Sequence, residues 1–346
     1  MNFIYFNINI ILYNNFIFLF ISVNMENLYN PGLIPLRAYT YHPKDDEKVD
    51  ELIGYPLRRI FYVNKNSFSE KEKEKIKEVY LKAKEENYIL PDDYSAEQIL
   101  RQLIGNDYDI NVTFENIKFE IEWKKNNLPI ELTDEINKIL NLGFIYVHGR
   151  DKCFRPLIIL NPGKYDKTKF PFESWKNALN YFIEFVINNC LINGRVENWD
   201  LIVDCKDLKM TNIPFDFQKI FVENHKVYRC RLYKMFLINL TGIFEFFWNL
   251  AKKIIGPVIE AKASKIENND NYKNLFEIIN RDQVEQKYGG NAPNLENGDY
   301  FPLKFINSNY YSEDEKNNNN FNNKVELDIY EDDNTKEIFY EAPETN

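Results

Sequence analysis

The chain has 346 residues, of which 44% are hydrophobic and 28% are charged, a globular composition long enough for about two domains. Its formal net charge is −10, which argues against a protein that follows nucleic-acid phosphates but does not exclude contact with a membrane. The four cysteines are widely spaced and form no zinc or redox motif, so we expect reduced thiols, no bound metal and a cytoplasmic protein.

Residues 1–24 are strongly apolar and carry no charged side chain. They lack the basic start and the small-residue cleavage site of a secretory signal, and their asparagines argue against a membrane-spanning helix. Because Met25 opens an ordinary polar sequence, we hypothesise that this extension lies upstream of the true start, which N-terminal peptide mapping would test. Residues 25–66 contain four prolines and no sustained hydrophobic period, so we expect an irregular arm.

Residues 67–140 predict a small helical domain. Capping-box patterns begin at Ser69 and Ser95, and each precedes a helical apolar face. A third helical pattern ends near Trp123, and Thr133 is suited to cap a fourth.

From residue 141 onward, short apolar and β-branched runs alternate with helical patterns. The candidate strands are residues 144–147, 157–160, 201–203, 235–238 and, more weakly, 263–266. Helical patterns between them cover residues 175–188 and 217–227. The alternation predicts an α/β domain at residues 141–290 with a mostly parallel, buried sheet. Residues 291–346 are acidic and rich in asparagine, which predicts a largely disordered tail.

Residues 240–257 carry an amphipathic helical pattern. Its apolar face consists of Phe244, Phe247, Trp248, Ala251, Ile254 and Ile255. Periodicity alone allows two interpretations. One is an ordinary core helix, and the other is a gate that closes an apolar cavity and swings onto the bilayer interface, which aromatic and cationic side chains suit.

The sequence around residues 143–162 predicts a β-hairpin, with two apolar runs around a Gly-Arg-Asp-Lys turn at 149–152 and an Arg-Pro pair at 155–156. A helix ending in Glu-Trp-Lys-Lys at 122–125 precedes it, and Tyr-Gly-Gly at 288–290 closes the region. In this order and spacing, the motifs resemble the CRAL-TRIO family of lipid-binding and lipid-transfer proteins.

The resemblance implies a helical N-terminal domain followed by an α/β domain, whose sheet forms the floor of a lipid cavity and whose lid is a helix. It makes the helix at 240–257 the gate and places on the cavity floor the side chains of Leu157, Ile159, Ile202 and Leu237. It further implies a monomer without cofactor or catalysis that associates peripherally with membranes. Such a protein binds one phospholipid and transfers or presents it between membranes.

For the lipid headgroup, the phosphatidylinositol-transfer members of the family keep a lysine after the lid, where Lys262 is the better match and Lys265 the alternative. Their Tyr-Pro-Glu-Arg segment is Tyr-Arg-Cys-Arg at 228–231 here, so Cys230 replaces the glutamate and Arg231 follows it. Of their basic Leu-Arg-Ala-Arg-Lys run only Arg101 remains. The headgroup candidates are therefore Arg101, Arg231, Lys262 and Lys265.

These departures leave two alternatives open, a carrier of a non-phospholipid hydrophobe and a lipid-sensing adaptor without transfer activity. The three histidines, His42, His148 and His225, are far apart in sequence and form no metal-binding or catalytic motif. We therefore expect no enzymatic activity.

Overall fold

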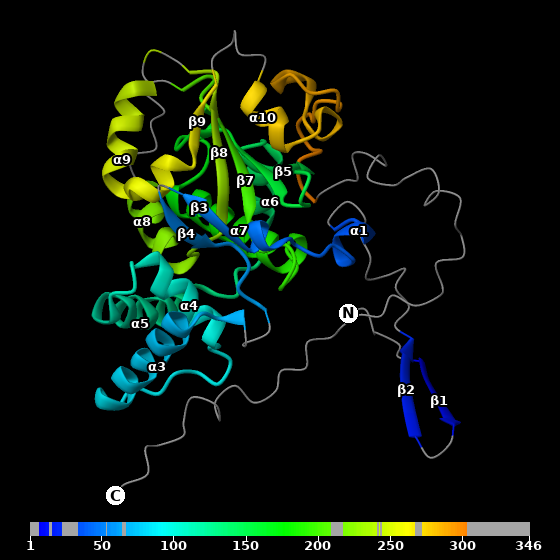
Figure 1. The fold of residues 1–346 in the computed structure, drawn as a ribbon. Coiled ribbons are helices and arrows are strands. Elements are labelled where there is room, and N and C mark those ends of the chain that lie inside the picture. The colour runs from blue at the N-terminus through cyan, green and yellow to red at the C-terminus, as the bar shows by residue number, and fades with distance from the viewer. Residues whose placement is uncertain are drawn as a thin grey trace, which may run out of the picture.

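The computed structural model describes residues 7–13, 16–22, 34–52, 54–63, 67–208, 217–240, 242, 244–266 and 272–302 (Figure 1). Most of the expected tail, residues 303–346, lies outside the described residues. The sequence predicts a disordered tail from residue 291, but residues 291–302 pack onto the fold, where Ala292, Tyr300 and Phe301 are buried. None of the described helices is both long and apolar enough to cross a bilayer.

Short elements precede the helical domain, in the order β1 (Asn7–Tyr13), β2 (Phe16–Ser22), α1 (Leu36–Tyr39), α2 (Asp45–Lys48), β3 (Val49–Leu52) and β4 (Tyr55–Arg58). β1 pairs with β2, and β3 pairs with β4, both antiparallel. The arm that we expected to be irregular therefore contains a hairpin. Its turn includes Gly54 at a φ of +75°, a backbone conformation that glycine adopts readily.

The helical layer consists of α3 (Glu70–Glu85), α4 (Ala96–Gly105) and α5 (Ile110–Asn127). Ser69 and Ser95 each complete a capping box at the start of α3 and α4, so both predicted helix starts are confirmed. The three helices bury a common core in which Ile76, Leu100 and Phe114 are fully inaccessible. Figure 1 shows this layer at one end of the sheet.

The fourth helix, α6 (Asp134–Asn141), starts where Thr133 accepts a hydrogen bond from the Ile136 N–H at 3.2 Å, as the sequence predicts. Its buried side chains do not join the core of the other three helices. Ile136 and Leu140 instead share a core with Trp175 of α7 (Phe172–Cys190). α6 therefore packs as part of the α/β region.

The main sheet has five strands in the order β5 (Ile145–Arg150), β6 (Pro156–Leu160), β7 (Trp199–Asp204), β8 (Leu232–Ile238) and β9 (Ala263–Lys265). β5 and β6 form an antiparallel hairpin, and every later pairing is parallel. The remaining α-helices are α8 (Phe217–Val227), α9 (Phe244–Ala261) and α10 (Lys273–Ile278). The expected mixed α/β fold with a mostly parallel sheet is confirmed.

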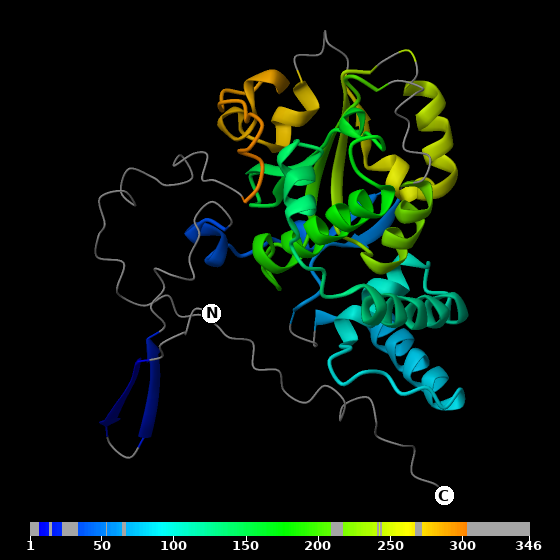
Figure 2. The same ribbon diagram turned by 180° about the vertical axis from the view of Figure 1, so that it is seen from behind.

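The two faces of this sheet are covered by different parts of the chain (Figures 1 and 2). On one face, Ile158 packs with side chains of α6, α7 and α8, and Leu237 packs with Trp248 of α9. On the other face, Ile159 and Phe236 pack with Leu275 of α10 and with the C-terminal segment up to Tyr300. Crossover helices thus cover one face, and α10 with the following residues up to Tyr300 covers the other.

Candidate functional site

The gate predicted from the sequence corresponds to α9, which follows β8 directly. Trp248 is the gate residue whose side chain the structure describes, and it is buried against Cys205, Met235 and Leu237 at the β7 and β8 end of the sheet. The other predicted gate residues lie in α9, but their side chains are outside the described part of the chain: Phe244, Phe247, Ala251, Ile254 and Ile255. α9 therefore contacts the sheet, on the face that carries Met235 and Leu237, through at least one large aromatic side chain.

The helix is broken near its C-terminal end. Gly256 has φ 71° and ψ 171°, a non-helical conformation, and Pro257 follows it, so α9 consists of two helical pieces joined at this point. An ion pair between Lys252 and Glu260, with 3.6 Å between nitrogen and oxygen, spans the break.

The structure divides the predicted floor residues between the two faces of the sheet. Parallel pairing places Ile159 opposite Ile202, and Val203 opposite Leu237. Because side chains alternate along a strand, Leu157, Ile159 and Ile202 face α10 and the C-terminal segment. Leu237 packs with Trp248 on the α9 face.

The two candidate headgroup lysines follow α9. Lys262 is buried, and its ammonium donates a hydrogen bond to the Leu232 carbonyl oxygen at 2.6 Å. Burial, followed by the charge of Arg59, lowers the pKa of Lys262 to about 8. Lys265 is exposed at the end of β9, where it pairs with Leu237 in the sheet.

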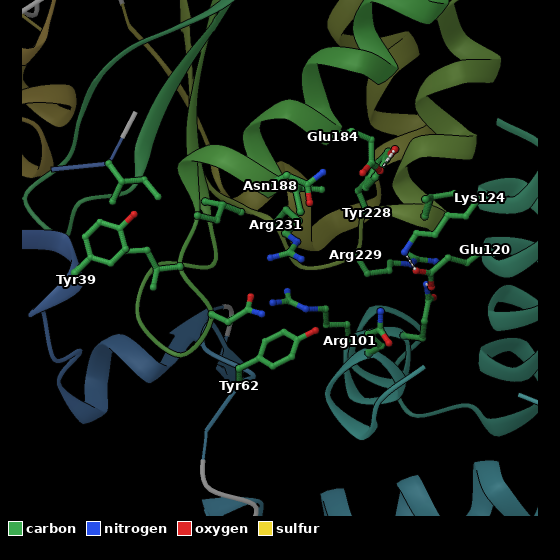
Figure 3. Close-up of a pocket in the computed structure, with 18 residues that line it drawn as sticks. Tyr39, Tyr62, Arg101, Glu120, Lys124, Glu184, Asn188, Tyr228, Arg229 and Arg231 are labelled. Carbon is green, nitrogen blue, oxygen red and sulfur yellow. Dashed lines mark hydrogen bonds and ion pairs between the residues drawn. The ribbon is translucent and has the colours of Figure 1, made fainter. Parts of the chain in front are cut away.

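The two candidate headgroup arginines lie elsewhere, in a cleft of about 620 Å³ between the helical layer and the ends of α7 and α8 (Figure 3). Arg101 comes from α4 and Arg231 from the segment just before β8. Figure 3 shows their guanidinium groups turned toward each other across the cleft. Arg101 and Arg231 are therefore brought together, and neither Lys262 nor Lys265 lines the same space.

A fully buried carboxylate, Glu197, holds the walls of the cleft together. One oxygen accepts hydrogen bonds from the backbone N–H groups of Phe61, Tyr62 and Gly194, at 3.1, 2.9 and 2.9 Å. The other oxygen pairs with Arg101, whose guanidinium also lies 4.0 Å from the Phe61 ring centre. Three segments far apart in sequence thus converge on one side chain.

Comparison with known families identifies the region that carries these features. The family model of the CRAL/TRIO domain matches residues 140–290. Residues 140–290 are a CRAL/TRIO domain. The resemblance seen in the sequence motifs is therefore confirmed.

Two known proteins are similar to this chain. A CRAL-TRIO domain-containing protein of Schizosaccharomyces pombe is 19% identical over 207 residues, which are 56% of this chain and 45% of that protein. The chain therefore spans less than half the length of this relative. The crystal structure of Sfh5 is similar with 14% sequence identity and a TM-score of 0.49, over 68% of this chain and 92% of Sfh5.

The hairpin motif of the CRAL/TRIO domain forms a buried charge network. Asp151 accepts from the backbone N–H groups of Cys153 and Arg155, and it pairs with the Arg155 guanidinium at 2.9 Å. That guanidinium lies 3.6 Å from the ring centre of Tyr233 on β8. The Gly-Arg-Asp-Lys and Arg-Pro pattern thus ties the turn between β5 and β6 to Tyr233 on β8.

Sequence reasoning missed Arg229, a third arginine of the cleft. Its Nη2 donates to the Asn106 side-chain oxygen at 2.9 Å, and its Nη1 lies 3.1 Å from Nδ1 of His225. A Cβ on Gly105 would lie 2.5 Å from the Arg229 Cδ, so a larger residue at this position would force the Arg229 side chain to shift. Gly105 ends α4 and Asn106 is its C-cap, but the contact of both with Arg229 depends on tertiary structure.

Proposed function

We propose that this protein binds a single phospholipid in an apolar cavity between the sheet and α9, and transfers or presents it between membranes as α9 opens. Residues 141–290 would hold the lipid, and the helical domain at 67–140 would support one end of the sheet. Membrane contact would be peripheral and transient, made by a monomer without enzymatic activity. The proposal is supported by the CRAL/TRIO domain and by the position of α9 directly after β8.

The observation that carries the proposal is the packing of Trp248 onto Met235 and Leu237. An apolar contact of this kind is non-directional, so acyl chains can make the same kind of contact with Met235 and Leu237. Extracting a diacyl lipid exposes apolar surface worth about 0.8 kcal/mol per methylene, which only a dry cavity offsets. Leu237 belongs to this face, whereas Leu157, Ile159 and Ile202 would support the sheet from behind.

The break at Gly256 supplies a place where α9 can bend. A residue with positive φ between two helical pieces lets one piece rotate while the other stays attached to β9. Lys262 and Lys265 follow this second piece, so we assign the lipid phosphate to them. Binding a phosphate there would compensate the buried ammonium of Lys262, whose pKa is lowered to about 8.

The test is to incubate the full chain with mixed-lipid vesicles, repurify it and identify the bound lipid by mass spectrometry. One phospholipid per chain is the expected result. A stoichiometric neutral hydrophobe would instead favour the carrier alternative. The replacement of the family glutamate by Cys230 is the sequence feature that supports this alternative. A protein that retains no lipid would overturn the proposal in favour of the adaptor.

A further inference from the structure

The cleft between the helical layer and the CRAL/TRIO domain is chemically unlike the α9 face. Its walls come from α4, α5, α7, the end of α8 and the arm, and four of its residues are cationic: Arg101, Lys124, Arg229 and Arg231. The carboxylates among its lining residues are Glu120 and Glu184. Figure 3 shows these charged groups projecting from several elements into one space.

The carboxylates near the cleft are already engaged. Glu120 pairs with Lys124 at 2.7 Å and also accepts from the Tyr94 hydroxyl and the Gln102 amide. Glu184 accepts from the Tyr228 hydroxyl at 2.7 Å. Glu197, behind the cleft wall, pairs with Arg101.

Arg229 and Arg231 have no carboxylate partner within the described part of the chain. Arg231 donates to the Glu197 backbone oxygen at 3.1 Å, and Arg229 contacts the neutral groups of Asn106 and His225. Both side chains are half-buried and neither forms an ion pair there, so each guanidinium bears a desolvation cost that no direct carboxylate contact offsets. Burial lowers the pKa of both arginines, that of Arg231 to about 10, and for Arg231 the nearby charge of Arg101 adds to the effect.

Several donors in the cleft also lack an acceptor. Arg101 is only 6% exposed, yet its Nε and Nη1 make no hydrogen bond within the described residues, and neither does Nε of Arg229. The Gln102 side-chain oxygen is a buried acceptor in the same condition. The cleft therefore offers guanidinium donors together with one acceptor suited to a hydroxyl group.

We infer that this cleft is a binding site for a phosphate monoester with a hydroxylated body, held by Arg101, Arg229 and Arg231. Guanidinium groups match phosphate oxygens in pairs of charge-assisted hydrogen bonds. The volume of about 620 Å³ falls in the range of small-molecule sites and exceeds the needs of phosphate alone. The Gln102 oxygen would accept from a hydroxyl of the body. This site is separate from the cavity under α9, so either one can fail without the other.

The experiment is calorimetric titration of the full chain with glycerol 3-phosphate, inorganic phosphate and glycerol. We expect binding in the order glycerol 3-phosphate, then phosphate, with no binding of glycerol. Arg229→Gln should weaken glycerol 3-phosphate binding by about tenfold or more, as expected for loss of a charged hydrogen-bond donor. Lys219→Gln is the matched control, because Lys219 is an exposed cation on α8 that does not line the cleft.

Two sources of the phosphate are distinguished by vesicle flotation with phosphatidic acid. If glycerol 3-phosphate competes with the vesicles, and Arg229→Gln lowers flotation, the site takes a lipid headgroup. If glycerol 3-phosphate binds without competing, the ligand is water-soluble.

The inference is overturned if wild-type protein binds neither glycerol 3-phosphate nor the vesicles. It is also overturned if Arg229→Gln and Arg231→Gln, both shown to be folded by circular dichroism, bind as the wild type does. Arg231 also contacts the Glu197 backbone, so Arg231→Gln can fail to fold for a reason unrelated to the ligand. The second readout is therefore the rise in unfolding temperature that glycerol 3-phosphate causes in Arg229→Gln. A rise equal to that of the wild type would also overturn the inference.

Discussion

The α9 region and the cleft lie in one fold but are held by opposite kinds of contact. Trp248 attaches α9 to the sheet through apolar neighbours, and the helix is broken at Gly256. The cleft is fixed by Glu197, which accepts directional hydrogen bonds from Phe61, Tyr62 and Gly194. Apolar contacts can part and re-form without loss of geometry, whereas a buried carboxylate requires every donor in place. The contacts of α9 are therefore suited to movement, and those around Glu197 are suited to a fixed geometry.

Charged substitutions on the apolar face of α9 are expected to have the largest effect on lipid exchange. We expect Phe247→Asp with Trp248→Asp to slow phospholipid exchange between vesicles on the order of a hundredfold, because a carboxylate at position 248 is excluded from the apolar contact that Trp248 makes. Fluorescent-lipid transfer measures the rate, and circular dichroism checks the fold. Asn249→Asp, at an exposed neighbouring position, should leave exchange unchanged. Normal exchange in the double variant would refute the assignment of α9 as the gate.

Removing the carboxylate of Glu197 is expected to destabilise the walls of the cleft. Glu197→Ala leaves Arg101 buried without its partner and three N–H groups without an acceptor, so we expect a loss of about 3–5 kcal/mol in the free energy of unfolding. Urea denaturation measures it. Glu115→Ala provides the comparison, since Glu115 forms an exposed ion pair and should change stability by less than about 1 kcal/mol. Equal effects of the two substitutions would contradict the role of Glu197.

The break in α9 can be probed with a single methyl group. Gly256→Ala meets no atom within 4 Å but must keep a φ of +71°, so we expect a cost of about 1–2 kcal/mol or a straightened helix with slower lipid exchange. Gly242→Ala is matched, because its Cβ also has open space and no positive φ is imposed. If both variants exchange lipid and unfold like the wild type, the break is not a hinge.

The smallest expected effect is a pH dependence at the edge of the cleft. Burial, followed by the charge of Arg229, lowers the pKa of His225 from 6.5 to about 4. The folded state therefore resists protonation, and the stabilisation present above pH 6.5 is lost as the pH falls toward 4. Because the ring is half-buried, we expect roughly 1 kcal/mol over this window. His225→Gln should flatten the profile from pH 7 to pH 4, while His42→Gln should not; parallel profiles for all three proteins would exclude the effect.

Local signals explain most of what the sequence predicted correctly. The caps at Ser69, Ser95 and Thr133 depend on neighbours three residues away, so they are readable without tertiary structure. Each expected strand of the main sheet is present, with β7 extending the predicted 201–203 to Trp199–Asp204. The parallel pairing of β6, β7, β8 and β9 follows from the alternation of strands and helices.

Features that depend on distant contacts could not be read in the same way. The short apolar run of β6 is buried on both sides and that of β7 is at least half-buried on both, so the sequence does not reveal that Ile159 and Ile202 face away from α9. The hairpin at β3 and β4 follows prolines and charged residues that argue locally for a loop. The cleft brings together Arg101 of α4 and Arg231, which are far apart in the sequence, and the Arg229 side chain passes close to Gly105, the last residue of α4.

Glu197 also has a consequence for the order in which the molecule is made. The backbone N–H of Phe61 finds its acceptor 136 residues later in the chain. During synthesis, the helical layer can form its own core first, since its contacts are local. The hydrogen bonds that tie Phe61 and Tyr62 to Glu197 cannot form until residue 197 has been translated, and the cleft is complete only once Arg231 has followed.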